Sequence, residues 1–417
     1  MYKKFMLLVI VLCLIFSMNS MVFSQEVQIS FWYPLGGNSG RVFENLVNEF
    51  NNTHEEIYVE AIFTGGYGET VQKVMANLAG GDLPEGGLLP AAPLWTGRND
   101  NYLVEKYLNS PEGLDKDDFY SVLWDYNKYD GRICSLPFNN STPVMFYNKD
   151  LMKEIGLGTE PPETWDELKE MATKVKNYAK ETGRKGRLWP INMRNEDWMM
   201  KAFILQNNGK LMNEDNTQSL VNKPKAVEAI SFWSKLIEED LMPKATHNRA
   251  RDQFISGNLV FLYDTTGGVG SVANSVDFDF GTAALPGKEK RAVTVGGAGL
   301  AMFKSTEEKE KATWTFLKWL LSTENCIEFS KSTGYIPIRK SALNSEEIQN
   351  LFKNEPYYQA GFEQLKYAVS YEHFWEMGTF DDYMKDLISN VEQGAKSPQE
   401  AADKFVDQME KEIERNN

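Results

Sequence analysis

The sequence predicts an α/β protein of two lobes, joined by hinge segments around a central ligand cleft. The first part of the chain alternates between strands and helices, and about 390 residues remain after an N-terminal leader, which is more than one ordinary domain. The pattern becomes mainly helical past Asp150 and returns to a strand at 276–286, "VDFDFGTAALP". A chain that leaves a lobe and comes back forms a hinge, and ligands commonly bind beside such hinges.

The first 24 residues have the features of a secretory signal peptide. Lys3 and Lys4 precede an apolar run over 5–16, and small Ser24 suits cleavage before Gln25. A lipid anchor at Cys13 is the alternative, but Leu12 stands where a lipoprotein signal has a small residue. We therefore expect a periplasmic or extracellular protein.

Composition narrows the classes of partner. Loss of the two leader lysines takes the formal net charge from −15 to −17, which disfavours nucleic acid and anionic membranes as partners. Cys134 and Cys326 are the cysteines left in the mature chain, too few for a disulfide framework. The sequence favours buried free thiols but leaves a pairing between them open.

The expected first lobe comprises 25–138 and 286–325. Residues 27–34 alternate as a strand that ends at Pro34, and 57–63 form a second strand. Between them an amphipathic helix places five apolar residues on one face: Val42, Phe43, Leu46, Val47 and Phe50. A further helix is expected after "GGYGET", to about Leu78.

The expected second lobe comprises 139–285 and 326–417. Thr164 and Glu167 predict a capping box at the start of a helix, and Ser397 predicts the cap of the C-terminal helix. The apolar run 259–264 predicts a short buried strand.

Several segments, taken in order, resemble one known family. They are "GGYGET" (65–70), "FNNSTPVMFYNKDLMKEIGL" (138–157), "PPETWDELKEMATKVK" (161–176), "VGGAGLAMFK" (295–304), "FLKWLLSTEN" (316–325) and "STGYIPIRK" (332–340). Together they resemble the family 1 extracellular solute-binding proteins of ABC importers, in particular the members that bind glycerol 3-phosphate. The resemblance implies a periplasmic-binding-protein type II fold, a small-molecule ligand, permease subunits as partners, a monomer, and neither cofactor nor metal.

The resemblance also implies ligand-binding residues. Five matching positions keep the residue type of the glycerol-3-phosphate-binding members, including the glycine that offers a backbone donor: Tyr67, Ser141, Trp165, Gly297 and Tyr335.

Other positions depart from that pattern. A pocket glutamate is replaced at Ala91, and pocket serines fall at or beside Gly267 and Gly268. Glu376 falls where those members have a phosphate-binding arginine, and a carboxylate there would repel a phosphate dianion. The sequence therefore leaves open a neutral mono- or oligosaccharide, a glycerol-3-phosphate-type solute, and a glycerophosphodiester with a cationic head group.

Aromatic residues provide a second set of candidates. Tyr67, Trp165 and Trp375 are expected as walls for a sugar face or a cation, and Trp198 is a further candidate. The uncharged stretch from Asn139 to Thr142 offers amides and hydroxyls that suit a polyol, with Ser141 as the expected contact.

A secreted glycoside-acting enzyme is the rival class. The chain's histidines, His54, His247 and His373, are isolated and lack zinc-type spacing, and no G-x-S-x-G nucleophile elbow occurs. A pair of catalytic carboxylates is not excluded by composition. We predict a binding protein without catalytic residues.

Overall fold

The computed structural model describes residues 26–90, 92–97, 101–369 and 377–416. The predicted signal peptide and candidates Trp375 and Glu376 lie outside the described residues. In the described part of the chain, no helix is both long and apolar enough to cross a membrane.

The first lobe is built on a mixed sheet. Its strands follow the order β2 (Ile57–Phe63), β1 (Val27–Tyr33), β3 (Gly86–Leu89), β12 (Gly299–Met302) and β6 (Leu136–Pro137). β1 pairs in parallel with β2 and β3, whereas β12 pairs antiparallel with β3 and β6. Both predicted strands of this lobe are thus confirmed.

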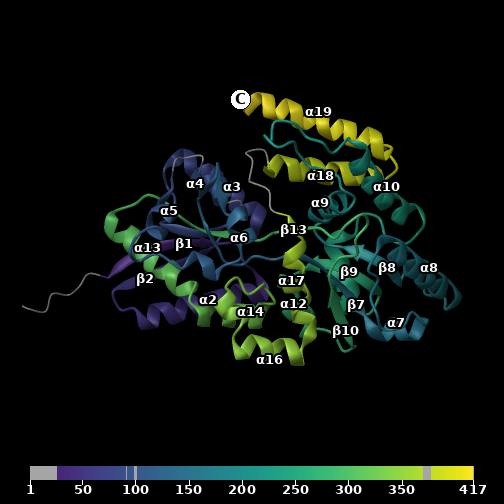
Figure 1. Ribbon diagram of the computed structural model, residues 1–417, viewed down its shortest axis with the longest axis horizontal. Coiled ribbons are helices and arrows are strands. Elements are labelled where there is room, and N and C mark those ends of the chain that lie inside the picture. Colours follow the sequence, from purple (N-terminus) through teal and green to yellow (C-terminus); the bar gives the residue numbers. More distant parts are fainter. Residues whose placement is uncertain (1–25, 91, 98–100, 370–376, 417) are drawn as a thin grey trace, which may run out of the picture.

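Helices cover this sheet and provide its core. The amphipathic helix is α2 (Gly37–Thr53), which buries Phe43, Leu46, Val47 and Phe50. Figure 1 shows α2 and α13 around the sheet. The helices of this part are α2, α3 (Tyr67–Gly80), α4 (Ala92–Gly97), α5 (Leu103–Leu108), α6 (Ser121–Tyr126), α13 (Glu307–Leu320), α14 (Thr323–Thr333), α15 (Lys340–Leu343) and α16 (Glu346–Asn354).

The second lobe contains a separate sheet. Its strands follow the order β10 (Phe280–Ala283), β7 (Pro143–Asn148), β9 (Leu259–Thr265) and β8 (Trp189–Met193). β7 pairs antiparallel with β9, which pairs in parallel with β8. The start of β7 and the carboxyl ends of β8 and β9 therefore lie at one edge of this sheet.

Helices and their caps complete the second lobe. The predicted capping box is present: the Glu167 backbone N–H donates to Thr164 Oγ1 at 3.2 Å, and Glu167 Oε2 accepts from the Thr164 N–H at 3.3 Å. The helices here are α7 (Lys149–Ile155), α8 (Trp165–Glu181), α9 (Glu196–Gln206), α10 (Pro224–Glu238), α11 (Ala250–Ile255), α12 (Val269–Ala273), α18 (Met377–Glu392) and α19 (Pro398–Asn416).

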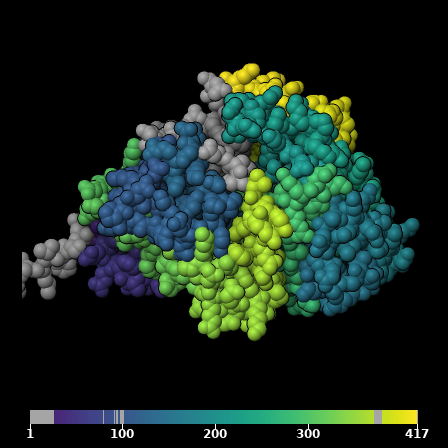
Figure 2. Space-filling view, viewed as in Figure 1, coloured from purple at the N-terminus to yellow at the C-terminus, as the bar shows by residue number. Residues whose placement is uncertain are grey.

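The structure differs from the expected lobe division after residue 325. α14 packs against α2, and Cys326, Phe329 and Ile348 belong to the core around the first sheet. The apolar face of α14 packs against α2, which is far away in sequence, so the local pattern does not reveal this partner. The chain then passes through α17 (Ala360–Glu363) and β13 (Ala368–Val369), and Figure 2 shows this yellow-green surface between the blue first lobe and the green and teal second lobe.

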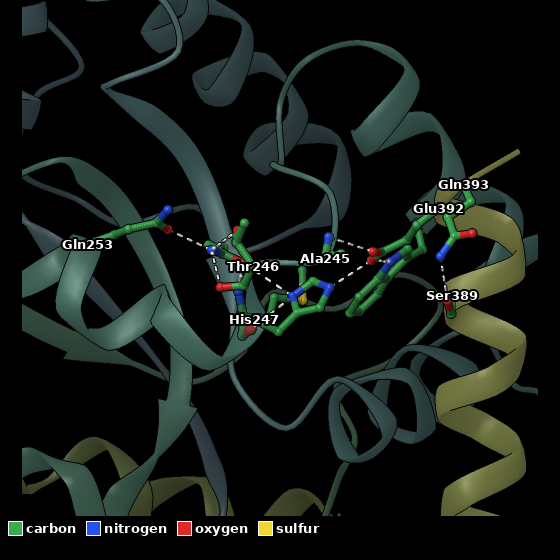
Figure 3. A network of polar contacts seen from close by, with 10 residues as sticks. Ala245, Thr246, His247, Gln253, Ser389, Glu392 and Gln393 are labelled. Atoms are coloured by element: carbon green, nitrogen blue, oxygen red, sulfur yellow. Dashed lines mark hydrogen bonds and ion pairs between the residues drawn. The ribbon is translucent and has the colours of Figure 1, made fainter.

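A buried polar network fixes α18 to the rest of the second lobe (Figure 3). Glu392, at the end of α18, accepts from Trp233 Nε1 at 2.9 Å and from the Ala245 backbone N–H at 3.0 Å, and its Oε1 lies 2.7 Å from His247 Nε2. The other ring nitrogen of His247 lies 3.1 Å from the Met193 carbonyl. α18 also packs on α9, so these contacts position the helix that follows candidates Trp375 and Glu376.

Cys134 and Cys326 are buried and free, as the sequence favoured. Burial raises the pKa of each thiol to about 12, so both remain protonated at neutral pH.

Candidate functional site

Two chain segments that join the lobes lie side by side. The Ser141 backbone N–H donates to the Gly296 carbonyl at 3.1 Å, and the Gly296 N–H donates back to Ser141 at 2.8 Å. The first segment also accepts hydrogen bonds from other parts of the chain, from Ile336 N to Asn140 O and from Thr266 N to Thr142 O. The uncharged stretch singled out in the sequence is thus the centre of the junction.

The Asn139 side chain connects both lobe-joining segments to α3. Its Nδ2 donates to the Tyr67 hydroxyl at 2.8 Å, and its Oδ1 accepts from the Ala298 backbone N–H at 2.9 Å. Gly297 passes close to it with φ +112°, and a Cβ there would lie 2.3 Å from the Asn139 carbonyl oxygen. Only glycine fits this conformation and this close approach without strain.

Two tyrosines meet at Asn139. Burial raises the pKa of the Tyr67 phenol well above its usual value, and the neighbouring Tyr335 phenol adds to the effect, although 37% of Tyr67 as a whole is exposed. Burial also raises the pKa of Tyr335, whose ring stacks on Phe329 with 5.4 Å between centroids. Both phenols therefore stay neutral at physiological pH and can donate hydrogen bonds.

Trp198 reaches the same place from the second lobe. It lies in the first turn of α9, is half-buried, and sits so close to Gly296 that a Cβ there would lie 2.7 Å from the Trp198 ring. The junction cluster is therefore composed of Tyr67, Asn139, Ser141, Trp198, Gly296, Gly297 and Tyr335. The structure thus brings together five of the residues that the sequence indicated as ligand contacts: Tyr67, Ser141, Trp198, Gly297 and Tyr335.

Trp165 does not join the junction cluster, contrary to expectation. Its ring is 2% exposed and stacks on Phe232 with 4.5 Å between centroids, and Phe203 lies at 5.0 Å. The indole N–H donates to Gln206 Oε1 at 2.8 Å. In the core of the second lobe, aromatic neighbours cover the ring and Gln206 accepts the hydrogen bond of the N–H group. In this conformation Trp165 is therefore a packing residue.

Buried polar atoms without partners lie on the first lobe-joining segment and on the residue beside it that follows β9. Among the described residues, neither Asn140 Oδ1 nor Thr266 Oγ1 has a hydrogen-bond partner, although both residues are at most 3% exposed. Such atoms are rare in folded proteins and call for an explanation. The junction cluster thus offers hydroxyl, amide and aromatic groups, and the described residues contain no cluster of His, Cys, Asp and Glu that could hold a metal ion.

The sequence placed Asn139 in the uncharged polar stretch but indicated Ser141 as its contact, and it did not indicate Gly296 as a member of this cluster. Asn139 is distinguished by its contacts with Tyr67 and Ala298, which are remote in sequence. For Gly296 the signal was available, because two adjacent glycines in a strand-like segment indicate close approach of another group.

Comparisons with known proteins agree with this architecture. A family model for bacterial extracellular solute-binding proteins matches residues 45–356. The sn-glycerol-3-phosphate-binding periplasmic protein UgpB of Salmonella typhimurium is 25% identical over 405 residues, which cover 91% of each chain.

Solved structures show the same fold. UgpB from Mycobacterium tuberculosis in complex with glycerophosphocholine superposes with a TM-score of 0.83 at 22% identity, covering 93% of this chain and 99% of that one. The ABC substrate-binding protein Lmo0181 from Listeria monocytogenes, in complex with cycloalternan, gives a TM-score of 0.81 at 21% identity with the same coverages.

Proposed function

Because the chain belongs to the bacterial extracellular solute-binding protein family, we propose that it captures a sugar or a glycerol-3-phosphate-type solute outside the cytoplasm and delivers it to the permease of an ABC importer. The observation that carries this proposal is the junction cluster. It gathers Tyr67 and Tyr335 from the first lobe, Trp198 from the second, and Ser141 between them, which is the arrangement that a ligand held between two lobes requires.

The paired lobe-joining segments support a hinge mechanism. One pair of backbone hydrogen bonds, between Ser141 and Gly296, holds them together, so the lobes can rotate about a short and defined axis. Closure on a ligand would provide partners for Asn140 Oδ1 and Thr266 Oγ1, and would cover a hydroxylated ligand with the Trp198 ring. The permease then distinguishes the closed, loaded form.

The ligand classes rest on the chemistry of the cluster and on the relatives. Neutral phenols, hydroxyls and amides suit the hydroxyl groups of a sugar or of glycerol. The relatives named above bind glycerol 3-phosphate, glycerophosphocholine or cycloalternan. A glycerophosphodiester is accordingly the second candidate, and Trp198 would face its cationic head group.

Calorimetric titration tests the proposal. We expect saturable one-to-one binding of at least one compound from a panel of neutral mono- and oligosaccharides, glycerol 3-phosphate and glycerophosphocholine. We also expect Tyr335→Phe to weaken that binding. Release of product from an oligosaccharide incubated with the wild-type protein would instead favour the glycoside-acting enzyme. Absence of binding to every compound would contradict the proposal.

A further inference from the structure

Two arginines converge on one buried carboxylate at the junction edge of the second sheet. Asp264 lies on β9 next to the strand end and is fully buried. Its Oδ2 accepts from Arg251 Nε at 2.6 Å and lies 3.9 Å from Arg194 Nη1, while its Oδ1 accepts from the Thr265 backbone N–H at 2.8 Å. We call Arg194, Arg251 and Asp264 the arginine cluster.

The arginine cluster carries more positive charge than its carboxylate neutralises. Two guanidinium groups face one aspartate, and the Arg194 and Arg251 side chains are only 32% and 20% exposed. Arg194 makes no side-chain hydrogen bond to any other described residue, and Arg251 uses only Nε. Each guanidinium has five N–H donors, so most of them are available. Partly desolvated cations with unused donors are costly unless an anion or water completes them.

The arginine cluster adjoins the junction cluster. A Cβ on Gly267 would lie 2.7 Å from Cζ of Tyr335, the carbon that carries the hydroxyl, and a Cβ on the next residue, Gly268, would lie 2.4 Å from Arg251 Nη2. Consecutive Cα atoms are about 3.8 Å apart, so the guanidinium and the phenol flank the same short segment. The charges of Arg251 and Asp264 also influence the pKa of Tyr335, consistent with this proximity.

Arg194 approaches from the neighbouring strand. It follows the last residue of β8, where its backbone N–H donates to the Tyr263 carbonyl at 2.9 Å, and it precedes α9, whose first turn contains Trp198. On the other side of β9, Asp264 pairs with Val144, which follows the Ser141 segment. The arginines thus extend the junction cluster along the ends of β8 and β9.

We infer that Arg194 and Arg251, positioned by Asp264, form an anion subsite for the ligand, which therefore carries an oxyanion group. The inference rests on the proposed function and narrows its ligand class. A guanidinium binds a phosphate or carboxylate through paired, charge-assisted hydrogen bonds. In a chain with a formal net charge of −15, such a local positive site is needed to offset the repulsion of an anion. Phosphate esters and acidic sugars share this chemistry.

The test compares anionic ligands with neutral counterparts by calorimetry. Glycerol 3-phosphate and glycerophosphocholine probe the phosphate source, digalacturonate probes the carboxylate source, and glycerol and maltose are the neutral counterparts. Arg194→Gln is the first variant, because the Arg194 side chain makes no hydrogen bond to another described residue and lies 3.9 Å from Asp264. Its control, Arg187→Gln, makes the same charge change at an exposed residue whose side chain contacts the Gly183 carbonyl.

We expect an anionic probe to bind the wild-type protein more tightly than its neutral counterpart. Arg194→Gln should weaken that binding at least about tenfold, the effect of losing a charged hydrogen bond, whereas Arg187→Gln should change it less than about twofold. Arg251→Gln combined with Asp264→Asn removes the other arginine without leaving a buried unpaired carboxylate, and should weaken anion binding similarly.

Two results would overturn the inference. In the first, maltose binds tightly, anionic probes bind no better, and neither variant changes the affinity. The arginines would then only neutralise and position Asp264, and the proposed function would remain intact. Binding of none of the probes would contradict the proposed function as well. The phosphate and carboxylate probes, compared with each other, identify the source of the oxyanion.

Discussion

Asn139 shows how one side chain can hold a junction together. Its amide donates to a hydroxyl on α3 and accepts from the second lobe-joining segment, so it connects Tyr67 and Ala298, which are remote from it in sequence. The residue is fully buried. Its loss would affect the geometry of both lobe-joining segments.

We predict that Asn139→Ala lowers both stability and ligand affinity. The substitution leaves the Tyr67 hydroxyl and the Ala298 N–H without their partner, at about 1–3 kcal/mol for each buried group. Chemical denaturation measures the free energy of unfolding, and calorimetry measures the affinity. Asn77→Ala is the control, because among the described residues the Asn77 side chain bonds to the carbonyl of Lys73 in its own helix and to no other group. Equal stability of Asn139→Ala and wild type would contradict the prediction.

Trp165 leads to a different expectation. Because Phe203, Phe232 and Gln206 occupy its ring faces and its N–H group, Trp165→Ala should leave a cavity and lower the free energy of unfolding by about 3–5 kcal/mol. Trp165→Phe should restore part of this loss. Tm and ligand affinity are measured together. A variant that loses affinity but keeps the wild-type Tm would return Trp165 to the ligand site.

At the scale of elements, local signals predicted well what depends on local chemistry. The capping box of α8 and the strands β1, β2 and β9 follow from residues adjacent in sequence. The placement of α14 on α2 depends on the fit of two helices far apart in the chain, and the packing of Trp165 depends on Gln206. Such contacts could not be predicted, because a hydrophobic pattern shows which face is buried but not against what.

The attachment of α18 should depend on pH. Burial opposes the charged form of His247, but the hydrogen bond and the negative charge of Glu392 outweigh burial and raise the pKa of His247. Burial also opposes the charge on Glu392, but the hydrogen bonds from His247 and Trp233 and the charge of His247 outweigh it and lower the pKa of Glu392. A raised histidine pKa gives stability below about pH 6.5 that is lost as the pH rises, and a lowered glutamate pKa gives stability above about pH 4.5 that is lost as the pH falls.

We therefore expect the ion pair to contribute most between about pH 4.5 and 6.5. Unfolding free energies measured from pH 4 to 9 should show this contribution decline toward alkaline pH in the wild type. His247→Gln should remove that part of the pH dependence, because glutamine can donate to Glu392 without titrating. Parallel pH profiles for the two proteins would contradict the expectation.

For the whole molecule, the two sheets and the paired segments between them suggest rotation of one lobe against the other. The backbone bonds between Ser141 and Gly296 lie where both segments cross, and Gly297 takes a positive φ beside them. Rotation concentrated in so few residues is typical of hinge closure. The ligand would then act by stabilising the closed arrangement.

We predict that a bound ligand lowers the radius of gyration of the wild-type protein, measured by small-angle X-ray scattering with and without saturating ligand. Gly297→Ala should abolish most of this change, because its Cβ would meet the Asn139 carbonyl oxygen at 2.3 Å and its φ of +112° is strained for alanine. Gly131→Ala is the matched control: its φ of +70° also lies in the left-handed region, but a Cβ there would meet no atom of the described residues within 4 Å beyond its chain neighbours. If both variants contract like the wild type on binding, closure does not depend on the Gly297 segment, and the hinge lies elsewhere.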